Sequence, residues 1–277
     1  MNTPSKVWFV TGTSSGFGRS LAEELIARGE RVVATARDPR TVSDLLALAP
    51  ERVLALRLDV TKGDEIRSAV KAAAERFGAI DVLVNNAGYS IVGAVEETSE
   101  AELRAAFEPM FFGAVAMTQA VLPGMRERRS GTIVQITSVG GVVTAPGFGP
   151  YCAVKHALEA LSEALAGEVA PFGMRVLIVE PGAFRTRLFG GSFRSMPALD
   201  AYKESVGPTR AFAEQSEGKQ PGDPAKAARA IIDAVNAGAP NLRLPLGADA
   251  VQNIRAKLAQ VTADVDQTES VASATAF

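Results

Sequence analysis

The stretch VWFVTGTSSGFG (residues 7–18) runs from a short apolar segment into three closely spaced glycines. VWFV is predicted to be a first strand, and a helical pattern begins directly after the glycines. In such a turn Gly12 permits a tight exit from the strand, Gly16 lets the backbone approach a pyrophosphate, and Gly18 lets the helix pack on the sheet. The helix N-terminal amides would then face the phosphates.

The spacing of these glycines is G-x-x-x-G-x-G, not the more widely quoted G-x-G-x-x-G. Three glycines could also form a merely flexible turn. Their position after the first strand of an α/β chain favours nucleotide binding.

Apolar runs alternate with helical periods along the rest of the chain. Strands are expected at 7–10, 31–36, 53–58, 80–84, 132–137 and 175–180, with a last one at 242–246. Helices are expected near 17–28, 64–77, 99–126 and 151–170. The strand-like runs are nearly continuous in Val, Ile and Leu, which is typical of parallel strands covered on both faces. The pattern predicts an α/β fold, a doubly wound parallel sheet with helices on both faces.

No internal repeat or linker divides the 277 residues, so residues 1–277 are expected to form a single dinucleotide-binding catalytic domain. The segment at about 184–222 is rich in Gly, Ser, Pro, Phe and Met, and we expect it to be a substrate lid. This segment is called the lid segment below. A C-terminal helix is expected at about 250–266, where an apolar stripe comprises Val251, Ile254, Leu258, Val261 and Val265. Core packing is the expected role of the stripe, and a subunit contact or pocket cover is the alternative.

The bulk composition points to small-molecule partners. The net charge is -2 and no basic block suggests nucleic acid. No apolar run reaches the ~18 residues of a membrane span, and the polar start MNTPSK (1–6) is too short for a signal peptide. One cysteine and one histidine make a zinc site unexpected, so no metal is predicted. The single cysteine fits a reducing compartment, and a cytoplasmic location is expected.

The end of the second predicted strand bears on the choice of cofactor. An acidic residue there would bind the ribose 2′-hydroxyl of NAD, but the sequence reads Thr35-Ala36-Arg37. A guanidinium can grip a 2′-phosphate with two hydrogen bonds, and Arg19 could assist. Alternatively, Arg37 is a solvated residue that Asp38 neutralises. NADP(H) is therefore the preferred cofactor, with NAD(H) as the alternative.

Tyr151 and Lys155 lie four residues apart at the start of a predicted helix, so they share one helix face. A nearby ammonium favours the phenolate and would lower the tyrosine pKa. Such a tyrosine can exchange a proton with a carbonyl or alcohol oxygen near neutral pH. Ser138 follows a predicted strand at the sheet edge where ligands bind, and its hydroxyl could contact the same oxygen. Taken alone, a Tyr/Lys pair is usually structural.

Together these features resemble the short-chain dehydrogenase/reductase family. The matching elements are TGTSSGFG (11–18), NNAG (85–88), Ser138, Tyr151-x-x-x-Lys155 and PGAFRT (181–186), in the family's order, over roughly residues 5–240. The resemblance implies a Rossmann-type domain with seven parallel strands. It implies Tyr151 as acid/base, Ser138 as the group that polarises the carbonyl, and Lys155 as the residue that binds the nicotinamide ribose and lowers the Tyr151 pKa.

The resemblance also implies the residues that hold the cofactor. They are Gly12, Ser14, Ser15, Gly16, Phe17, Gly18, Arg37, Asp59, Val60, Asn85, Ala87, Gly88, Pro181, Gly182, Ala183 and Thr186, together with Tyr151 and Lys155. A homodimer or homotetramer is implied as well, with the helices at 99–126 and 151–170 as contacts.

The stretch FEPMFFG (107–113) departs from the family pattern. The family carries a catalytic asparagine here, and the aligned residue is Met110, whose thioether donates no hydrogen bond. In the family the helix bends at this point, and the asparagine main-chain carbonyl holds a water that connects to the lysine. Pro109 supplies a bend by removing a backbone donor. We hypothesise that the Pro109 kink preserves a water site near Lys155 while Met110 fills the space; a weakened or redirected enzyme is the alternative.

The predicted activity is an NADP(H)-dependent interconversion of a carbonyl and a secondary alcohol on a fairly apolar small molecule. Apolar lid residues expected to line its pocket are Phe184, Leu188, Phe189, Phe193 and Met196, although ordinary packing explains them equally well. Tyr89 could enter the same pocket. Two alternatives stay open: a non-catalytic NADP(H)-binding regulatory protein, and a dehydratase or epimerase on the same scaffold.

Overall fold

Seven parallel strands form the main sheet of this computed structural model, which describes residues 5–238, 241–275 and 277. Their order across the sheet is β3-β2-β1-β4-β6-β7-β9. The bounds are β1 Val7–Val10, β2 Arg31–Ala36, β3 Val53–Arg57, β4 Val82–Asn85, β6 Gly131–Ile136, β7 Met174–Pro181 and β9 Arg243–Leu246. All seven predicted strands are confirmed, each end within two residues. The N-terminal prediction for residues 1–6 falls partly on 1–4, which lie outside the described residues.

The helices flank this sheet and extend beyond it. They are α1 Gly16–Ala27, α2 Ser43–Leu48, α3 Gly63–Phe77, α4 Glu100–Phe107, α5 Gly113–Glu127, α6 Gly149–Val169, α7 Gly207–Ser216, α8 Pro224–Ala237 and α9 Ala248–Ser273. Helices α2, α7 and α8 are additional to those predicted. The predicted C-terminal helix is present as α9 and is longer than expected.

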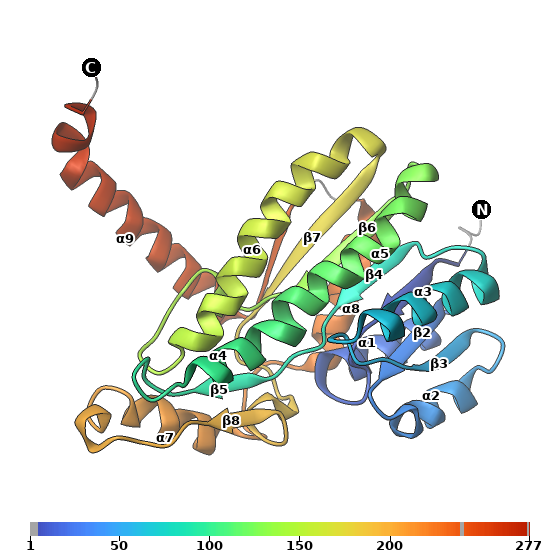
Figure 1. Cartoon of the computed structure of the whole chain (residues 1–277), viewed down its shortest axis with the longest axis horizontal. Helices are drawn as coiled ribbons and strands as arrows, with labels where there is room; N and C mark the ends of the chain where they lie inside the picture. The colour runs from blue at the N-terminus through green and yellow to red at the C-terminus, as the bar shows by residue number, and fades with distance from the viewer. Residues whose placement is uncertain (1–4, 239–240, 276) are drawn as a thin grey trace.

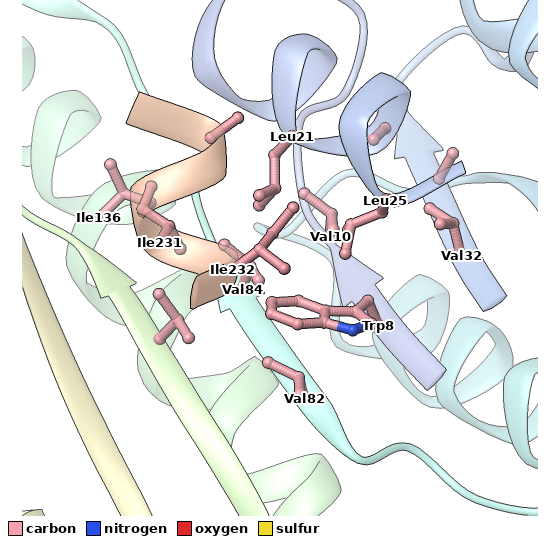
Figure 2. Packing of buried hydrophobic residues seen from close by; sticks show 14 of the residues in the cluster. Trp8, Val10, Leu21, Leu25, Val32, Val82, Val84, Ile136, Ile231 and Ile232 are labelled. Atoms are coloured by element: carbon pink, nitrogen blue, oxygen red, sulfur yellow. The ribbon is translucent and has the colours of Figure 1, made fainter. Parts of the chain in front are cut away.

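One face of the sheet is covered by α1, α2 and α8. Trp8 and Val10 of β1 pack beneath Leu21 of α1 and Ile232 of α8, and all four side chains are fully or almost fully buried (Figure 2). Burial of each such side chain contributes about 1.5–3 kcal/mol. This layer holds the first strand and the glycine turn after it in a fixed position.

The opposite face is covered by α3, α5 and α6 (Figure 1). Met117 and Met125 of α5 are fully buried there, beside Ile66 of α3 and Leu165 of α6. The continuous helical stretch Glu100–Glu127 is long and apolar enough to span a membrane by length and composition alone. In this fold the apolar side of its α5 part lies on the sheet, while Ala106 and Met110 pack in a separate cluster with residues of α6.

Capping-box spacing occurs in the sequence before two helices, at Ser99–Glu102 and at Thr61–Asp64, and it predicts an N-cap at each. The first is confirmed, because the Ser99 hydroxyl accepts from the Glu102 N–H while the Glu102 carboxylate accepts from the Ser99 N–H at the start of α4. The second is wrong, since α3 has Lys62 as its N-cap residue and no side-chain cap within the described residues. The Thr61 hydroxyl instead donates to Asp59 at 2.8 Å.

A single π-helical turn, Glu108–Phe112, joins α4 to α5 at the predicted irregularity. Pro109 lies within it and has no backbone N–H to donate. The Gly113 N–H bonds to the Glu108 carbonyl, the wider spacing that defines a π turn. The turn directs Met110 inward, where it is 2% exposed.

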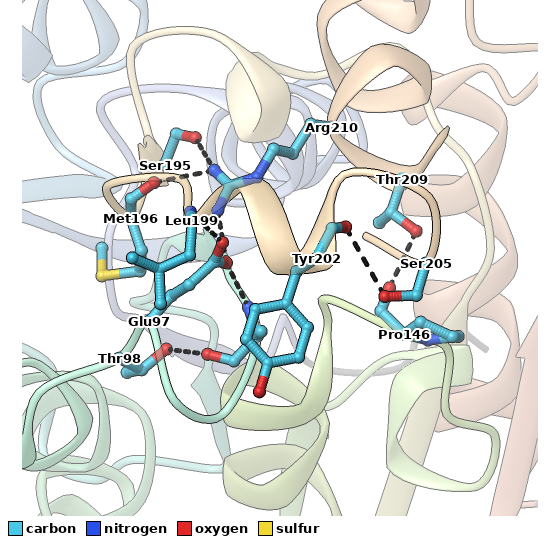
Figure 3. A network of polar contacts seen from close by, with 11 residues as sticks. Glu97, Thr98, Pro146, Ser195, Met196, Leu199, Tyr202, Ser205, Thr209 and Arg210 are labelled. Carbon is cyan, nitrogen blue, oxygen red and sulfur yellow. Dashed lines mark hydrogen bonds and ion pairs between the residues drawn. The ribbon is translucent and has the colours of Figure 1, made fainter. Parts of the chain in front are cut away.

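The lid segment folds over the carboxyl ends of the strands. It contributes β8 (Phe193–Ser195), which pairs with β5 (Ser90–Val92) in a small parallel sheet, and it also contains α7. Glu97 anchors it: the carboxylate accepts from the Leu199 N–H at 2.8 Å and from Arg210 at 2.6 Å (Figure 3). The Leu199 N–H is the main cause that holds the pKa of Glu97 below its usual value.

Helix α9 begins against the sheet and then leaves the body of the molecule (Figure 1). Ala250 in its first turn is buried, whereas every residue at 258–273 is exposed. Leu258, Val261 and Val265 are 56%, 42% and 60% exposed. The expectation that this apolar stripe packs in the core is therefore wrong, because only the start of α9 touches the rest of the chain.

Candidate active site

A groove of about 1040 Å³ crosses the carboxyl ends of the strands. One end lies against the glycine turn and Arg37, and the other reaches Tyr151 beneath Phe189 of the lid segment. Strand order reverses here, because β2 lies on one side of β1 and β4 on the other. Open parallel sheets bind ligands at such a switch point.

The glycine turn has the backbone shape that a close-bound phosphate requires. Gly12 and Gly16 have φ of +71° and +58°, in the left-handed region that side chains disfavour. A Cβ on Gly18 would lie 2.4 Å from both Asn86 Nδ2 and the Gly12 carbonyl oxygen. Gly18 therefore serves packing and, although also predicted to hold the cofactor, does not line the described groove, whereas Gly12 and Gly16 do.

The start of α1 is suited to an anion. Within the described residues, the Ser15 side chain makes no cap hydrogen bond and the first turn carries no acidic residue. The first amides of the helix are left to face the groove beside Ser14, Ser15 and Phe17. These features fit a pyrophosphate at the positive end of the helix.

Arg37 lies where the adenosine end of a dinucleotide would be expected. It lines the groove next to the buried Ala36, and within the described residues it forms no ion pair. Asp38 pairs with Arg40 at 2.8 Å, so Asp38 does not neutralise Arg37. Arg19 is held by Glu23 and Asp44, which occupy its guanidinium.

Asp59 and Val60 line the same end of the groove. Burial tends to raise the pKa of Asp59, but the Thr61 N–H and hydroxyl bond to its carboxylate and bring the pKa below the usual value. Asp59 is thus ionised at neutral pH and its side chain is fixed.

Asn85 does not line the main groove, so its side chain is not placed for the predicted cofactor contact. Its Nδ2 bonds inward to the Ala114 carbonyl, Thr118 Oγ1 and Gln135 Oε1 at 3.2, 3.1 and 3.0 Å. The next residue, Asn86, takes the place in the groove and donates to the Thr11 and Gly12 carbonyls at 2.9 and 3.0 Å. Ala87 and Gly88 line the groove as predicted. Strand alternation explains the difference, because β4 ends at Asn85 with that side chain turned into the protein.

The loop after β7 lines the groove through Pro181, Gly182, Ala183 and Thr186, four residues that the sequence predicts to hold the cofactor. Sequence reasoning missed two neighbours from α9. Asp249 accepts the Ala183 N–H at 2.7 Å, and both Asp249 and Asn253 line the groove. Asp249 is 66 positions from Ala183, and no local pattern relates the two.

Ser138, Tyr151 and Lys155 converge at the deep end of the groove. Ser138 follows β6, and its Oγ accepts the Gly140 N–H at 3.0 Å. Tyr151 and Lys155 are 8% and 6% exposed, on one face of α6. Lys155 Nζ donates to the Ile136 carbonyl at 2.9 Å and lies 5.7 Å from the centroid of the Tyr151 ring.

Burial is the largest influence on the pKa values of Tyr151 and Lys155. It raises the pKa of Tyr151 to about 12, although the Ser138 hydroxyl opposes the rise. It lowers the pKa of Lys155 to about 8, with Glu159 acting in the opposite direction. Desolvation of the phenolate therefore opposes the lowering of the tyrosine pKa that the Tyr151/Lys155 spacing predicts.

Met110 packs against Gly88, where an added Cβ would lie 3.0 Å from Met110 Cγ. A separate cavity of about 10 Å³ lies beside it, and Pro109, Asn85 and Lys155 are in its wall. Asn85 Oδ1 is buried and has no partner within the described residues. A cavity of this size is at the lower limit for one water molecule.

Aromatic side chains roof the end of the groove above Tyr151. The Phe189 ring centroid lies 6.2 Å from Phe148, 5.9 Å from Phe193 and 6.0 Å from Phe212. At the mouth, the Arg194 guanidinium lies 4.4 Å from the centroid of the Tyr89 ring. Leu188 also lines the groove, but Met196 does not and packs in a buried cluster with Met110.

His156 and Cys152 play structural parts at the start of α6. His156 Nδ1 lies 3.0 Å from the Gly140 carbonyl oxygen and 2.9 Å from that of Cys152. Burial raises the pKa of the Cys152 thiol to about 11, so it is not a thiolate at neutral pH.

A dinucleotide-shaped groove that ends in a serine, a tyrosine and a lysine defines a nicotinamide-dependent oxidoreductase site. The family profile for short chain dehydrogenase matches residues 6–196, and this chain belongs to the short-chain dehydrogenase/reductase family. The oxidoreductase BOA17 of Botryotinia fuckeliana is 39% identical over 267 residues, which cover 95% of this chain and 96% of that protein.

Two solved structures extend the comparison. A short-chain dehydrogenase from Streptomyces avermitilis is 51% identical, with complete coverage of both chains and a TM-score of 0.94. A short chain dehydrogenase from Burkholderia cenocepacia in complex with NADP is 25% identical, with a TM-score of 0.75 and coverage of 96% of this chain and 98% of that one. A nicotinamide cofactor is supported for this chain.

Proposed function

We propose that this protein interconverts a carbonyl and a secondary alcohol on a fairly apolar small molecule, with NADP(H) as its preferred cofactor. The observation that carries the proposal is the convergence of Ser138, Tyr151 and Lys155 at the deep end of a groove whose other end fits a dinucleotide phosphate.

The reduction direction suits the protonation of this site. When bound, the reduced cofactor supplies the hydride for the carbonyl carbon. Tyr151, with a pKa of about 12, is a neutral phenol at pH 7 and can donate its proton to the carbonyl oxygen. The Ser138 hydroxyl lies in the same part of the groove and can hold that oxygen. The Lys155 ammonium stabilises the phenolate that the transfer leaves behind.

The roof of the groove supports an apolar substrate. Phe148, Phe189 and Phe212 offer ring faces and edges above Tyr151, and such surfaces favour hydrocarbon or aromatic groups. Arg210 of the lid segment pairs with Glu97, which anchors that segment, and neither charge lies in the groove wall that the structure describes.

The preference for NADP(H) rests on Ala36 and Arg37. Ala36 offers no carboxylate to a ribose 2′-hydroxyl, and Arg37 retains its donors for a 2′-phosphate. NAD(H) is the alternative cofactor, and a higher measured affinity for NADPH than for NADH would exclude it.

Loss of NADPH absorbance with a panel of apolar ketones and aldehydes tests the proposal. We expect turnover that the Tyr151→Phe variant loses while it still binds NADPH. Tight NADPH binding with no turnover across the panel would favour the regulatory alternative. Product analysis would show whether any turnover is a reduction or instead a dehydration or epimerisation.

We also propose that the protein forms a homodimer or homotetramer and acts in the cytoplasm. Leu103 and Phe112, on the helical stretch from α4 to α5, are 36% and 53% exposed and would be covered in a contact of that kind. Sedimentation of the full chain would test the assembly.

A further inference from the structure

Helix α9 carries a second apolar pattern that the catalytic site does not use. Apolar and small residues recur at alternating intervals of three and four, at Val251, Ile254, Leu258, Val261, Val265, Thr268 and Ala272. This is the heptad spacing of a helix that pairs with another helix along a narrow seam. Because the spacing averages 3.5, the seam drifts only about 20° per heptad along α9, and a slight supercoil keeps it facing a paired helix.

The seam lacks a partner within the described part of the chain. All of its residues from Leu258 onward are exposed, and α9 points away from the sheet (Figure 1). Helical segments of this kind are marginal in water unless an apolar face is covered. Something outside the described chain is therefore expected to cover it.

The charges along α9 identify that partner. Arg255 and Lys257 lie in its first half, where the one carboxylate, Asp249, is turned to the Ala183 N–H, whereas Asp264, Asp266 and Glu269 lie in the exposed second half. Acidic groups toward a helix C-terminus oppose the helix dipole, and the last turn has no basic residue to offset them. A second α9 running the other way would bring its basic half beside these carboxylates.

We propose that α9 pairs with α9 of a second copy of this chain as an antiparallel, two-fold symmetric coiled coil. The register that joins the opposite charges sets Val261 against Val265 of the other copy and Arg255 beside its Glu269. Each contact then occurs twice, as a two-fold interface requires. A membrane surface is disfavoured as the occupant, because the acidic half would be repelled by anionic lipid.

The geometry leaves room for both bodies. The seam from Ile254 to Ala272 spans about 27 Å at 1.5 Å per residue. Antiparallel pairing puts the two catalytic bodies at opposite ends of this span. In the same register, Thr262 of one copy lies beside Thr262 of the other copy at the two-fold axis. The two Asp264 carboxylates also lie next to each other and repel. Asp264→Asn should therefore strengthen the pairing.

Cysteine cross-linking tests the pairing directly. We expect Thr262→Cys to form a disulfide-linked dimer under mild oxidation, whereas Ser270→Cys, on the outward face, serves as the matched control and should not. The native Cys152 is 3% exposed and does not compete. Equal cross-linking of both variants, or none with Thr262→Cys, overturns the proposal whatever other subunit contacts exist.

Charge exchange tests the direction of pairing. In the Thr262→Cys background, Arg255→Glu or Glu269→Arg alone should weaken association about fivefold, as expected when the two symmetry-related exposed charge pairs become repulsive. The double exchange should restore it. Leu258→Glu should halve the number of subunits in the assembly, as measured by mass photometry. The circular dichroism melting curve of the catalytic body should not change. A double variant as weak as the singles would refute the antiparallel register.

Discussion

Replacement of Arg37 by alanine should weaken NADPH binding and leave NADH binding nearly unchanged. Arg37 lines the groove directly after the buried Ala36 and forms no ion pair within the described residues. A hydrogen bond to a charged group contributes about 1.5–3 kcal/mol. Arg37 is exposed, so solvent screens its pair with a 2′-phosphate, and we expect about 1–2 kcal/mol. This corresponds to roughly 5–30-fold in the NADPH dissociation constant.

Fluorescence titration of the reduced cofactors measures both affinities without knowledge of the substrate. Titrations should be made at one ionic strength, because screening changes the contribution of an exposed charge. Arg40→Ala is the matched control. It removes the same charge three positions away, from a guanidinium that is already paired with Asp38.

Two outcomes would refute the reasoning about Arg37. In the first, Arg37→Ala and Arg40→Ala would weaken NADPH binding equally, which would reduce the effect to general electrostatics. In the second, NADPH and NADH affinities would fall together, which would place Arg37 against a part of the cofactor that both share. A companion variant, Ala36→Asp, should reverse the preference, because it restores the acceptor for a 2′-hydroxyl.

The other predictions concern catalysis and the lid segment. Tyr151→Phe should lower kcat about 10²–10⁴-fold in steady-state assays, with cofactor affinity retained in the titration. Since burial lowers the pKa of Lys155 to about 8, its ammonium is lost as pH rises through that value, and kcat/KM for reduction should fall above about pH 8 in a pH profile. Glu97→Gln should cost about 1–3 kcal/mol of thermal stability and raise KM for the substrate, because it removes the charge that pairs with Arg210. Because the pKa of Glu97 is lowered in the folded protein, its carboxylate stabilises the fold fully at pH values above its usual pKa of 4.5. This stabilisation is lost as the pH falls through the lower pKa of the folded state, and the melting temperature measured against acid pH would show the loss. Met110→Asn should leave kcat across pH nearly unchanged if the π turn preserves the water site; a large rise in activity would contradict that hypothesis.

Local chemistry in the sequence predicts the sheet and the phosphate end of the groove. Gly12 and Gly16 adopt positive φ where the turn needs it, and this requirement is visible in the residue type itself. The strands are buried on both faces, so their apolar runs are nearly continuous and easy to recognise.

The sequence alone does not predict the contacts that depend on tertiary packing. Asn85 and Asn86 are chemically identical neighbours, and only the pleat of β4 decides which one faces the groove. Asp249 reaches the Ala183 N–H from a distant helix. The tyrosine pKa depends on how deeply α6 is buried, which a spacing of four residues does not encode.

The apolar stripe on α9 shows a second limit of the same kind. A helix whose apolar face meets the core and one whose face meets another copy can share much of their pattern. The exposure of Leu258 and Val265 excludes the first for this chain. The separation of basic and acidic halves along the helix then carries information that hydrophobicity alone does not.

The exchange of asparagine for Met110 need not remove a polar environment from Lys155. The π turn at Glu108–Phe112 directs Met110 inward without closing the small cavity beside Lys155. Asn85 lies in the wall of that cavity and its Oδ1 lacks a partner within the described residues, while three acceptors fix the other end of its carboxamide. A buried acceptor of this kind is costly unless something donates to it. A water between Asn85 and Lys155 would donate to Asn85 Oδ1 and accept from the Lys155 ammonium. Asn85 at the end of β4 would then hold the water near Lys155, the role that the helix residue aligned with Met110 has in the family.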